Sequence, residues 1–359
     1  MAKFLIYSDI HIHSHKKSLD RLEDCLKTLD WIFRTACQYN IKNVLFAGDL
    51  FQHRQKIDIY AYQRTFEILQ KYQDVLNHWL LIGNHDMWQN EGWDVSSLVP
   101  LGAIKNVSII NRPCTMTIDG SPISFLPYTK SPIETLRGIE NDCEKPRILI
   151  AHIAVDGAIL NVRANTYSEE LVEHDGDMVK VDASIFNNWD QVFLGHYHAE
   201  QRLTDKIEYI GSPLELSYGE AFQKKHIIIY DSETGKKEYI ENTFSPKHYI
   251  CSPHEVEQIN FGEKAFIKIQ TNNLPENVEL QRKLISTQKF SEVKIEPIKR
   301  KLQEEKLIIE NAKAILADEE EMAQKYIEQV GLNGLLKSKL LEVFNTIRKE
   351  KEKKENLDG

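Results

Sequence analysis

Five short apolar runs mark the first part of the chain, and a glycine-containing or polar motif closely follows each of them. Runs of this length, flanked by Gly or polar residues, are typical of buried β-strands. Amphipathic stretches separate the first three runs, so the pattern predicts alternating strands and helices in a layered α/β domain. The runs are Phe4–Tyr7, Val44–Phe46, Leu80–Ile82, Ile148–Ile150 and Val192–Leu194.

Two amphipathic helices are predicted between these strands. Ser18 is placed to cap the first helix, and Asn40 ends it before the second strand. The second helix is expected from Tyr60 to Tyr72. The apolar face of the first helix follows steps of three and four residues and comprises Leu19, Leu22, Leu26, Leu29, Phe33 and Ala36.

The pattern changes after the fifth run. A hairpin of two strands, His226–Tyr230 and Glu238–Ile240, would complete a first domain that we bound at residues 1–245. Residues 250–300 then predict a small β-α-β domain. Its elements are the strand Ala265–Ile269, the helix Asn277–Ser286 and the strand Val293–Ile295.

Residues 301–359 form a third segment, in which charged residues dominate and strand patterns are nearly absent. The segment predicts a helical hairpin broken near Gly331–Gly334. In its second helix Leu336, Leu340 and Phe344 form a narrow apolar stripe, which needs a partner surface. The stripe either packs back on its own domain or binds another chain.

The composition narrows the classes of protein. A chain of 359 residues with 42% hydrophobic residues can bury a full core, but its net charge of −9 excludes coating of nucleic acid through an overall basic field. A local groove for DNA stays compatible with this charge. The N-terminus has no apolar leader, and no run reaches the roughly 18 residues of a membrane span. We therefore expect no membrane association and a cytoplasmic location, or the host cytoplasm for a phage protein.

The motifs that follow the five runs combine carboxylate, amide and imidazole groups. Because the carboxyl ends of parallel strands meet at one edge of a sheet, we expect these side chains to gather there. Mixed oxygen and nitrogen ligands suit borderline divalent metals, and they are too many for one ion, so they predict two. The motifs are Asp9-x-His11, Gly48-Asp49, Gly83-Asn84-His85-Asp86, His152 and Gly195-His196-Tyr197-His198.

Several of these motifs also have an ordinary structural explanation when taken alone. Asp9-x-His11 fits a capping aspartate beside a surface histidine, and Gly48-Asp49 fits a common turn. His152 fits a hydrogen-bonded histidine at a strand end. If each motif had only its structural explanation, the occurrence of all five in order at strand ends would be a coincidence. Taken together, the motifs therefore favour the metal site.

The set of motifs resembles the signature of the calcineurin-like metallophosphoesterases, D-x-H, G-D, G-N-H-[DE], H and G-H-x-H. The segment Gly211–Glu220, followed by Lys225 and a strand ending at Asp231, is similar to the corresponding segment of SbcD-type DNA repair nucleases. The helical tail is most similar to that of phage recombination endonuclease small subunits. This resemblance implies a β-sandwich flanked by helices, with a small β-α-β capping domain and a C-terminal helical hairpin.

The resemblance also implies a role for each motif residue. His85 would act near the leaving oxygen as a stabiliser or general acid, and Asp86 would support the catalytic site from behind. Manganese is the implied metal, with magnesium as the alternative. One ion would be held by Asp9, His11, Asp49 and His198, and the second by Asp49, Asn84, His152 and His196, so that Asp49 bridges them.

The activity implied by the resemblance is that of a DNA nuclease, with 3′-to-5′ exonuclease and single-strand endonuclease activity. It would act as a homodimer with an SbcC-type ATPase, which would bind the stripe of Leu336, Leu340 and Phe344. Two alternatives stay open. One is a phosphodiesterase for small phosphoesters or cyclic nucleotides, and the other is a non-catalytic DNA-end scaffold with structural metals.

One segment departs from the protein phosphatases of the same superfamily. Those enzymes carry, three residues after Gly-Asp, an aspartate that pairs with the catalytic histidine, whereas Gln52 stands at that place here. The difference argues against a protein phosphatase and leaves the partner of His85 open. Trp88 and Trp93 near this motif either stack on an unpaired base or pack beside the site.

Overall fold

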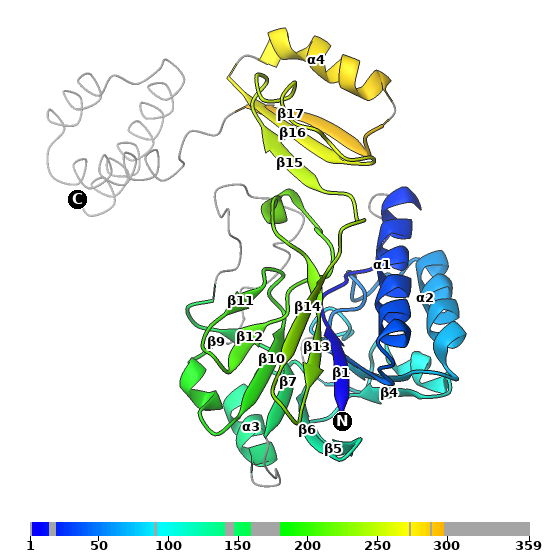
Figure 1. The fold of residues 1–359 in the computed structure, drawn as a ribbon, viewed down its shortest axis with the longest axis vertical. Helices are drawn as coiled ribbons and strands as arrows, with labels where there is room; N and C mark the ends of the chain where they lie inside the picture. The colour runs from blue at the N-terminus through cyan, green and yellow to red at the C-terminus, as the bar shows by residue number, and fades with distance from the viewer. Residues whose placement is uncertain are drawn as a thin grey trace, which may run out of the picture. The chain divides into compact units, whose positions relative to one another are not determined.

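Two six-stranded β-sheets form the body of the protein (Figure 1). The computed structural model describes residues 2–13, 19–89, 92–140, 147–158, 180–272, 274–287 and 289–297. One compact unit spans Met1–Glu296. The predicted tail, residues 301–359 with Leu336, Leu340 and Phe344, lies outside the described residues.

The first sheet has the strand order β14-β13-β1-β2-β3-β4. Strands β1 to β4 run parallel, and the predicted hairpin of β13 and β14 adds antiparallel to β1. The strands are β1 (Lys3–Tyr7), β2 (Asn43–Phe46), β3 (Asn77–Leu81), β4 (Val107–Ile110), β13 (His226–Asp231) and β14 (Lys237–Glu241).

The second sheet has the order β11-β12-β10-β7-β6-β5. Its four central strands are parallel, and the two edge strands are antiparallel to their neighbours. The strands are β5 (Cys114–Ile118), β6 (Ser121–Leu126), β7 (Ile148–His152), β10 (Gln191–Gly195), β11 (Gln201–Arg202) and β12 (Ile207–Tyr209).

An apolar layer fills the space between the two sheets. Phe4 and Ile6 of β1 belong to this layer together with Phe193 of β10, whereas Leu5 and Tyr7 belong to the core on the other face of the first sheet. Side chains alternate along a strand, so a strand covered on both sides needs apolar residues at every position. The uninterrupted apolar runs of the sequence are therefore strands buried on both faces.

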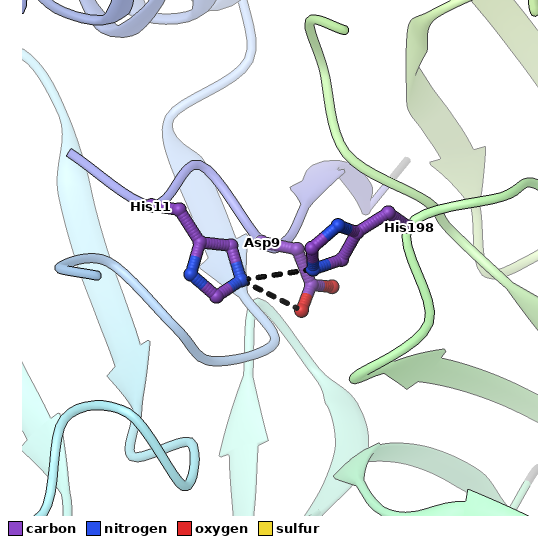
Figure 2. Close-up of side chains that lie close together, drawn as sticks. All are labelled: Asp9, His11 and His198. Atoms are coloured by element: carbon purple, nitrogen blue, oxygen red, sulfur yellow. Dashed lines mark hydrogen bonds and ion pairs between the residues drawn. The ribbon is translucent and has the colours of Figure 1, made fainter. Parts of the chain in front are cut away.

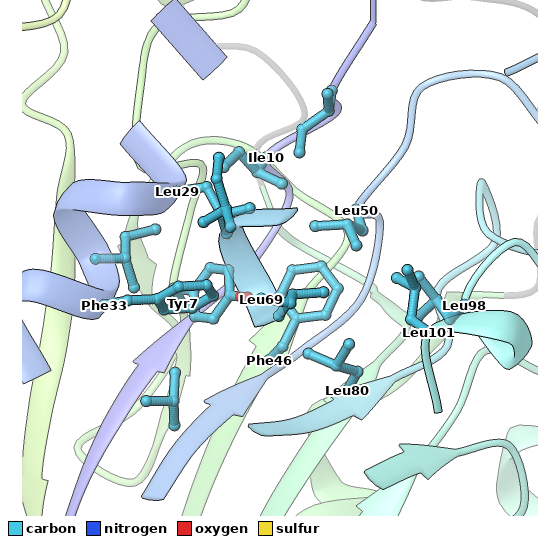
Figure 3. Close-up of a cluster of buried hydrophobic side chains, with 14 of the residues drawn as sticks. Tyr7, Ile10, Leu29, Phe33, Phe46, Leu50, Leu69, Leu80, Leu98 and Leu101 are labelled. Atoms are coloured by element: carbon cyan, nitrogen blue, oxygen red, sulfur yellow. The ribbon is translucent and has the colours of Figure 1, made fainter. Parts of the chain in front are cut away.

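Helices cover the outer faces of both sheets. Figure 3 shows Phe33 of α1 (Leu19–Gln38) beside Tyr7, in the cluster that α1 and α2 (Ile59–Tyr72) form with the first sheet. Helix α3 (Pro132–Glu140) contributes to the apolar cluster on the outer face of the second sheet. The predicted sandwich flanked by helices is confirmed.

The ends of the two predicted helices follow from local interactions. The predicted cap of α1, Ser18, lies outside the described residues, and Asn40 just beyond its end has a left-handed φ of 55°. Helix α2 begins one residue earlier than predicted. Asp58 caps it by accepting hydrogen bonds from the amides of Tyr60 and Ala61, at 2.9 and 3.3 Å.

A small three-stranded sheet with the order β15-β16-β17 follows the sandwich. The predicted strand, helix and strand are present, and β15, which pairs parallel with β16, is an additional strand. A separate apolar cluster, to which Leu280 and Leu284 contribute, lies within this module. Its elements are β15 (His248–Cys251), β16 (Phe266–Thr271), α4 (Leu274–Ser286) and β17 (Glu292–Pro297). The domain limits at residues 245 and 300 stay predictions.

The remaining elements are short. Within the described ranges, no helix combines the length and the apolar character needed to cross a bilayer. The short elements are β8 (Ala154–Val155), β9 (Lys180–Val181) and the 3₁₀ helices η2 (Val99–Ala103), η4 (Ala183–Phe186) and η5 (Tyr218–Glu220).

His78 on β3 is a polar group inside the layer beneath α1. Its ring is fully buried, and it lies edge-on to Phe33 with the ring centroids 4.5 Å apart. Neither ring nitrogen has a hydrogen-bond partner among the described residues. Burial lowers the pKa of His78 from 6.5 to about 3. Between these two values the unfolded chain binds a proton that the folded chain does not, so this residue lowers stability as the pH falls.

We expect His78→Leu to raise the free energy of unfolding by about 1 kcal/mol near neutral pH, because an unsatisfied buried polar group is removed. At about one pH unit below the ordinary histidine pKa the gain should grow by about 1 kcal/mol more. Chemical denaturation at the two pH values measures both effects, and the exposed His254→Leu serves as control. An identical pH dependence in parent and variant would contradict this account.

Candidate metal centre

The predicted ligands lie together at one edge of the sandwich. In the first sheet Asp9, Asp49 and Asn84 follow β1, β2 and β3. In the second sheet His152 ends β7, and His196 follows β10. Because the strands that carry these residues are parallel within each sheet, their carboxyl ends meet and bring residues far apart in sequence into contact.

A first group consists of Asp9, His11 and His198 (Figure 2). The Nε2 atoms of the two histidines lie 3.0 Å apart, and Asp9 Oδ1 lies 3.8 Å from His11 Nε2. One donor atom from each side chain lies within 4.8 Å of the other two. Atoms at this spacing can all contact one metal ion, because metal–ligand bonds to nitrogen and oxygen are about 2 Å long.

A second group consists of Asp49, His152 and His196, with Asn84 beside it. His152 Nε2 lies 3.2 Å from Asp49 Oδ2 and 2.8 Å from Asn84 Oδ1. His196 Nδ1 lies 3.0 Å from the same amide oxygen. The four side chains predicted to hold the second ion are therefore neighbours.

Asp49 lies between the two groups. Its Oδ2 is 3.6 Å from His11 Nε2 of the first group and 3.2 Å from His152 Nε2 of the second. One carboxylate oxygen thus faces ligands of both ions. This placement is the one that a bridging carboxylate requires.

The imidazole rings of His152 and His198 are oriented so that each can offer a lone pair to a cation. His152 Nδ1 lies 2.7 Å from the carbonyl oxygen of Ala47, and His198 Nδ1 lies 3.0 Å from Glu220 Oε1. Both Nδ1 atoms therefore carry a proton for these acceptors, and a neutral ring then has its lone pair on Nε2. Lone pairs of nitrogen and oxygen converge at both groups, and this mixed donor set suits two divalent metal ions.

The charges of the site favour the same conclusion. Burial disfavours the ionised form of Asp49, but His152 and His85 outweigh it and hold the pKa of this carboxyl well below its ordinary value. Burial likewise opposes a charge on His152, yet Asp49 raises its pKa to about 9. The buried carboxylate thus attracts a positive charge, which a metal ion supplies in place of the proton.

Four of the predicted ligands have strained backbone conformations. The φ angles are 51° for Asp9, 49° for His11, 64° for Asp49 and 99° for His196. Residues with a side chain rarely adopt positive φ, and each instance costs on the order of 1–3 kcal/mol. Such strain gathers at functional sites, where the surrounding structure holds it.

His85 lies beside both groups, and its partner is a main-chain atom. Its amide donates to Asp49 Oδ1 at 2.8 Å, and its Nδ1 lies 2.6 Å from the carbonyl oxygen of Gln52. The ring meets His11 edge-on with the centroids 4.9 Å apart. The partner that the sequence left open is therefore the backbone of Gln52, which no comparison of side chains could reveal.

Asp86, unlike His85, contacts main-chain amides rather than the side chains of the ligand groups. Its carboxylate is buried and accepts hydrogen bonds from four main-chain amides, at 2.8–3.3 Å. These amides belong to Asp49, Leu50, Phe51 and Gly83. Asp86 thus holds the loop after β2 against the turn after β3, which favours a supporting role over contact with substrate.

The structure adds one side chain that was not among the predicted site residues, Glu220 behind His198. Its only indication in the sequence was its position in the segment Gly211–Glu220.

The two tryptophans near the site differ in their surroundings. Trp93 donates to the carbonyl oxygen of Tyr128 at 2.7 Å, whereas Trp88 is 51% exposed.

The glycines of the motifs allow the close approach of the strand ends. A Cβ atom on Gly83 would lie less than 3.0 Å from Asp49 Oδ1, so we expect Gly83→Ala to displace this carboxylate. The affinity for Mn²⁺ should fall by about 10-fold or more, as measured by calorimetry. Gly138→Ala in α3, where a Cβ meets no atom within 4 Å, is the control and should bind as the parent does. Equal affinities in the two variants would contradict this geometry.

Comparisons relate this chain to known proteins. The sequence profile described as calcineurin-like phosphoesterase matches residues 2–200. Exonuclease subunit 1 of Enterobacteria phage T4 is 24% identical over 217 residues, which cover 58% of this chain and 60% of that protein. The SbcD component of the SbcCD nuclease from Escherichia coli K12 is 24% identical over 278 residues, 68% of each chain. The chain thus spans three fifths to two thirds of the length of these relatives.

A search of solved structures matches a crystal structure of a dimetal phosphatase from Danio rerio, with 10% identity and a TM-score of 0.39 over 67% of this chain and 98% of that one. The profile match spans more than half of the chain and includes all seven predicted metal ligands. The chain belongs to the calcineurin-like phosphoesterase family of metal-dependent hydrolases.

Proposed function

We propose that this chain is a two-metal-dependent DNA nuclease, with 3′-to-5′ exonuclease and single-strand endonuclease activity in DNA repair or recombination. The observation that carries the proposal is the pair of neighbouring ligand groups, with Asp49 in contact with both and His85 beside them. The relatives from phage T4 and E. coli are named as an exonuclease and a nuclease, which supports a nucleic acid as the substrate.

The ligands of each proposed site come from both sheets of the sandwich. Asp9, His11, Asp49 and His198 would hold one ion, and Asp49, Asn84, His152 and His196 the other. We propose Mn²⁺, with Mg²⁺ as the alternative, because mixed nitrogen and oxygen ligands admit both. Bound ions of this kind supply an activated water and stabilise the charge that develops on a phosphodiester.

The chain itself supplies the remaining chemistry. The carbonyl oxygen of Gln52 fixes the ring of His85 through Nδ1, so Nε2 is free to face the substrate. In the imidazolium form Nε2 carries a proton, which it can donate to the leaving oxygen. Asp49 orients the same residue by accepting its amide hydrogen. His85 is therefore the candidate general acid.

Two partners belong to the proposal. The SbcC-type ATPase would bind the apolar stripe of Leu336, Leu340 and Phe344. A second copy of this chain would pack near the start of α2, where Ile57, Ile59 and Phe66 line an apolar pocket and Ile59 is 84% exposed.

Two other functions compete with this proposal. A phosphodiesterase for small phosphoesters or cyclic nucleotides would use the same ions but would not need DNA. A non-catalytic DNA-end scaffold would need the ions but not His85. The exposed ring of Trp88 near the motif, suited to stacking on a base, favours DNA over a small ester.

A cleavage assay with Mn²⁺ on labelled single- and double-stranded DNA, and on bis(p-nitrophenyl) phosphate, separates these functions. We expect His85→Asn to lower the DNA cleavage rate by about 100-fold or more while Mn²⁺ and DNA binding persist, since only proton donation is lost. The exposed His53→Asn should cut at the parental rate. DNA binding without cleavage by the parent would indicate the scaffold. Turnover of the small ester alone would indicate the phosphodiesterase.

For the proposed tail contact, we expect the double variant Leu340→Glu and Phe344→Glu to lose co-purification with the ATPase, because two charges replace the centre of the stripe. Its Mn²⁺ content should stay at the parental value. Lys337→Glu, which changes a charge off the stripe, is the control. An intact complex with the double variant would reject this assignment.

A further inference from the structure

Glu220 lies behind His198, on the side away from the first ligand group. It ends the short helix η5 and is 3% exposed. Its Oε1 accepts the Nδ1 hydrogen of His198 at 3.0 Å, while His198 Nε2 faces His11. The histidine therefore stands between a carboxylate on one side and the proposed ion on the other.

A second set of contacts fixes Glu220 itself. Its Oε2 lies 2.6 Å from Lys225 Nζ, 3.0 Å from Ser212 Oγ and 3.2 Å from the amide of Leu216. Lys225 is 2% exposed and also donates to the carbonyl oxygen of His198 at 2.9 Å and to Ser212 Oγ at 2.8 Å. Both carboxylate oxygens of Glu220 are thus held, and the lysine binds the backbone of the same histidine.

The helix that carries Glu220 is also fixed from its other end. The Tyr218 hydroxyl donates to Glu292 Oε2 at 3.0 Å, and Lys268 Nζ lies 4.5 Å from the centre of the Tyr218 ring. Ser217 caps the helix by accepting from the amide of Gly219. Glu220 therefore has little freedom to follow His198 if the ring turns.

The other histidine of the first group is held differently. His11 Nδ1 is buried and has no hydrogen-bond partner among the described residues. His152 of the second group is held by a main-chain carbonyl. Among these three histidines, only His198 has an ionisable side chain as the partner of its Nδ1. A carboxylate in this position fixes the tautomer and makes the imidazole a stronger ligand.

We infer that Glu220 is a positioning residue for the metal held by His198, and that Lys225 and Ser212 hold its carboxylate against the ring. The inference rests on the proposed metal site. It goes beyond the ligand set, because it assigns a role to the segment between residues 211 and 225. Glu220 acts through His198 and does not itself contact the reacting atoms.

Calorimetric titration of the full chain with Mn²⁺ tests the inference without an activity readout. In the parent we expect two bound ions, and in Glu220→Gln we expect one of the two affinities to fall by about 10–100-fold. Glu208→Gln is the matched control, because Glu208 is also a buried carboxylate, paired with Lys237 and Tyr239. The control should bind both ions with parental affinity.

A milder variant and a spectroscopic measurement test the inference if Glu220→Gln does not fold. Ser212→Ala removes one hydrogen bond to Glu220 and one from Lys225, and we expect it to weaken the same site by a few-fold, about the value of one such bond to Glu220. In addition, ¹⁵N shifts of the histidine rings should show His198 as the Nδ1–H tautomer in the metal-free parent and in the Glu208→Gln control.

Parental affinity in a folded Glu220→Gln variant, or an Nε2–H tautomer of His198 in the parent, would overturn the inference. Equal loss at both sites would overturn it too, because Glu220 contacts a ligand of only one. If the parent binds two ions but does not cut DNA, the proposed nuclease fails while the positioning role stands.

Discussion

Asp49 is a buried carboxylate, and the structure around it serves to satisfy its charge. Its Oδ1 accepts the amide of His85, its Oδ2 faces His11 and His152, and its own amide donates to Asp86. Removing a carboxylate from water costs several kcal/mol unless such partners are present. The turn after β3 and the end of β7 must therefore be in place around the loop after β2. The site is therefore complete only when the two sheets are packed together.

Much of this arrangement follows from the sequence. Strands buried on both faces appear as uninterrupted apolar runs, and their parallel order places Asp9, Asn84 and His196 at one edge. Helices α1, α2 and α4 were predicted from the sequence, although the cap Asp58 was missed, and α3 was not predicted. Contacts made by main-chain atoms, such as the carbonyl groups of Gln52 and Ala47, could not be predicted, because every residue type has the same main-chain groups. Strand β15 was missed because its apolar run is short and lies in a polar stretch.

The strained ligands show how the sandwich holds an unfavourable backbone. The amides of Asp9 and His11 donate to the carbonyl oxygens of Gly48 and Asp49, at 2.9 and 3.1 Å, and the amide of His196 donates to the Asp9 carboxylate at 3.1 Å. These bonds connect neighbouring strand ends and, at Asp9, the two sheets. Strain at each ligand is thus offset by hydrogen bonds that exist only in the folded sandwich.

The motif glycines have a consequence for how distant relatives are recognised. A Cβ atom on Gly48, Gly83 or Gly195 would lie less than 3.0 Å from an atom of His152, Asp49 or Ala47. The presence of each glycine therefore indicates that two strand ends approach closely. The ligand residues alone do not indicate this. A diverged sequence that retained every ligand but carried larger residues at these places could not bring its sheets equally near. Its ligands could then not converge as they do here.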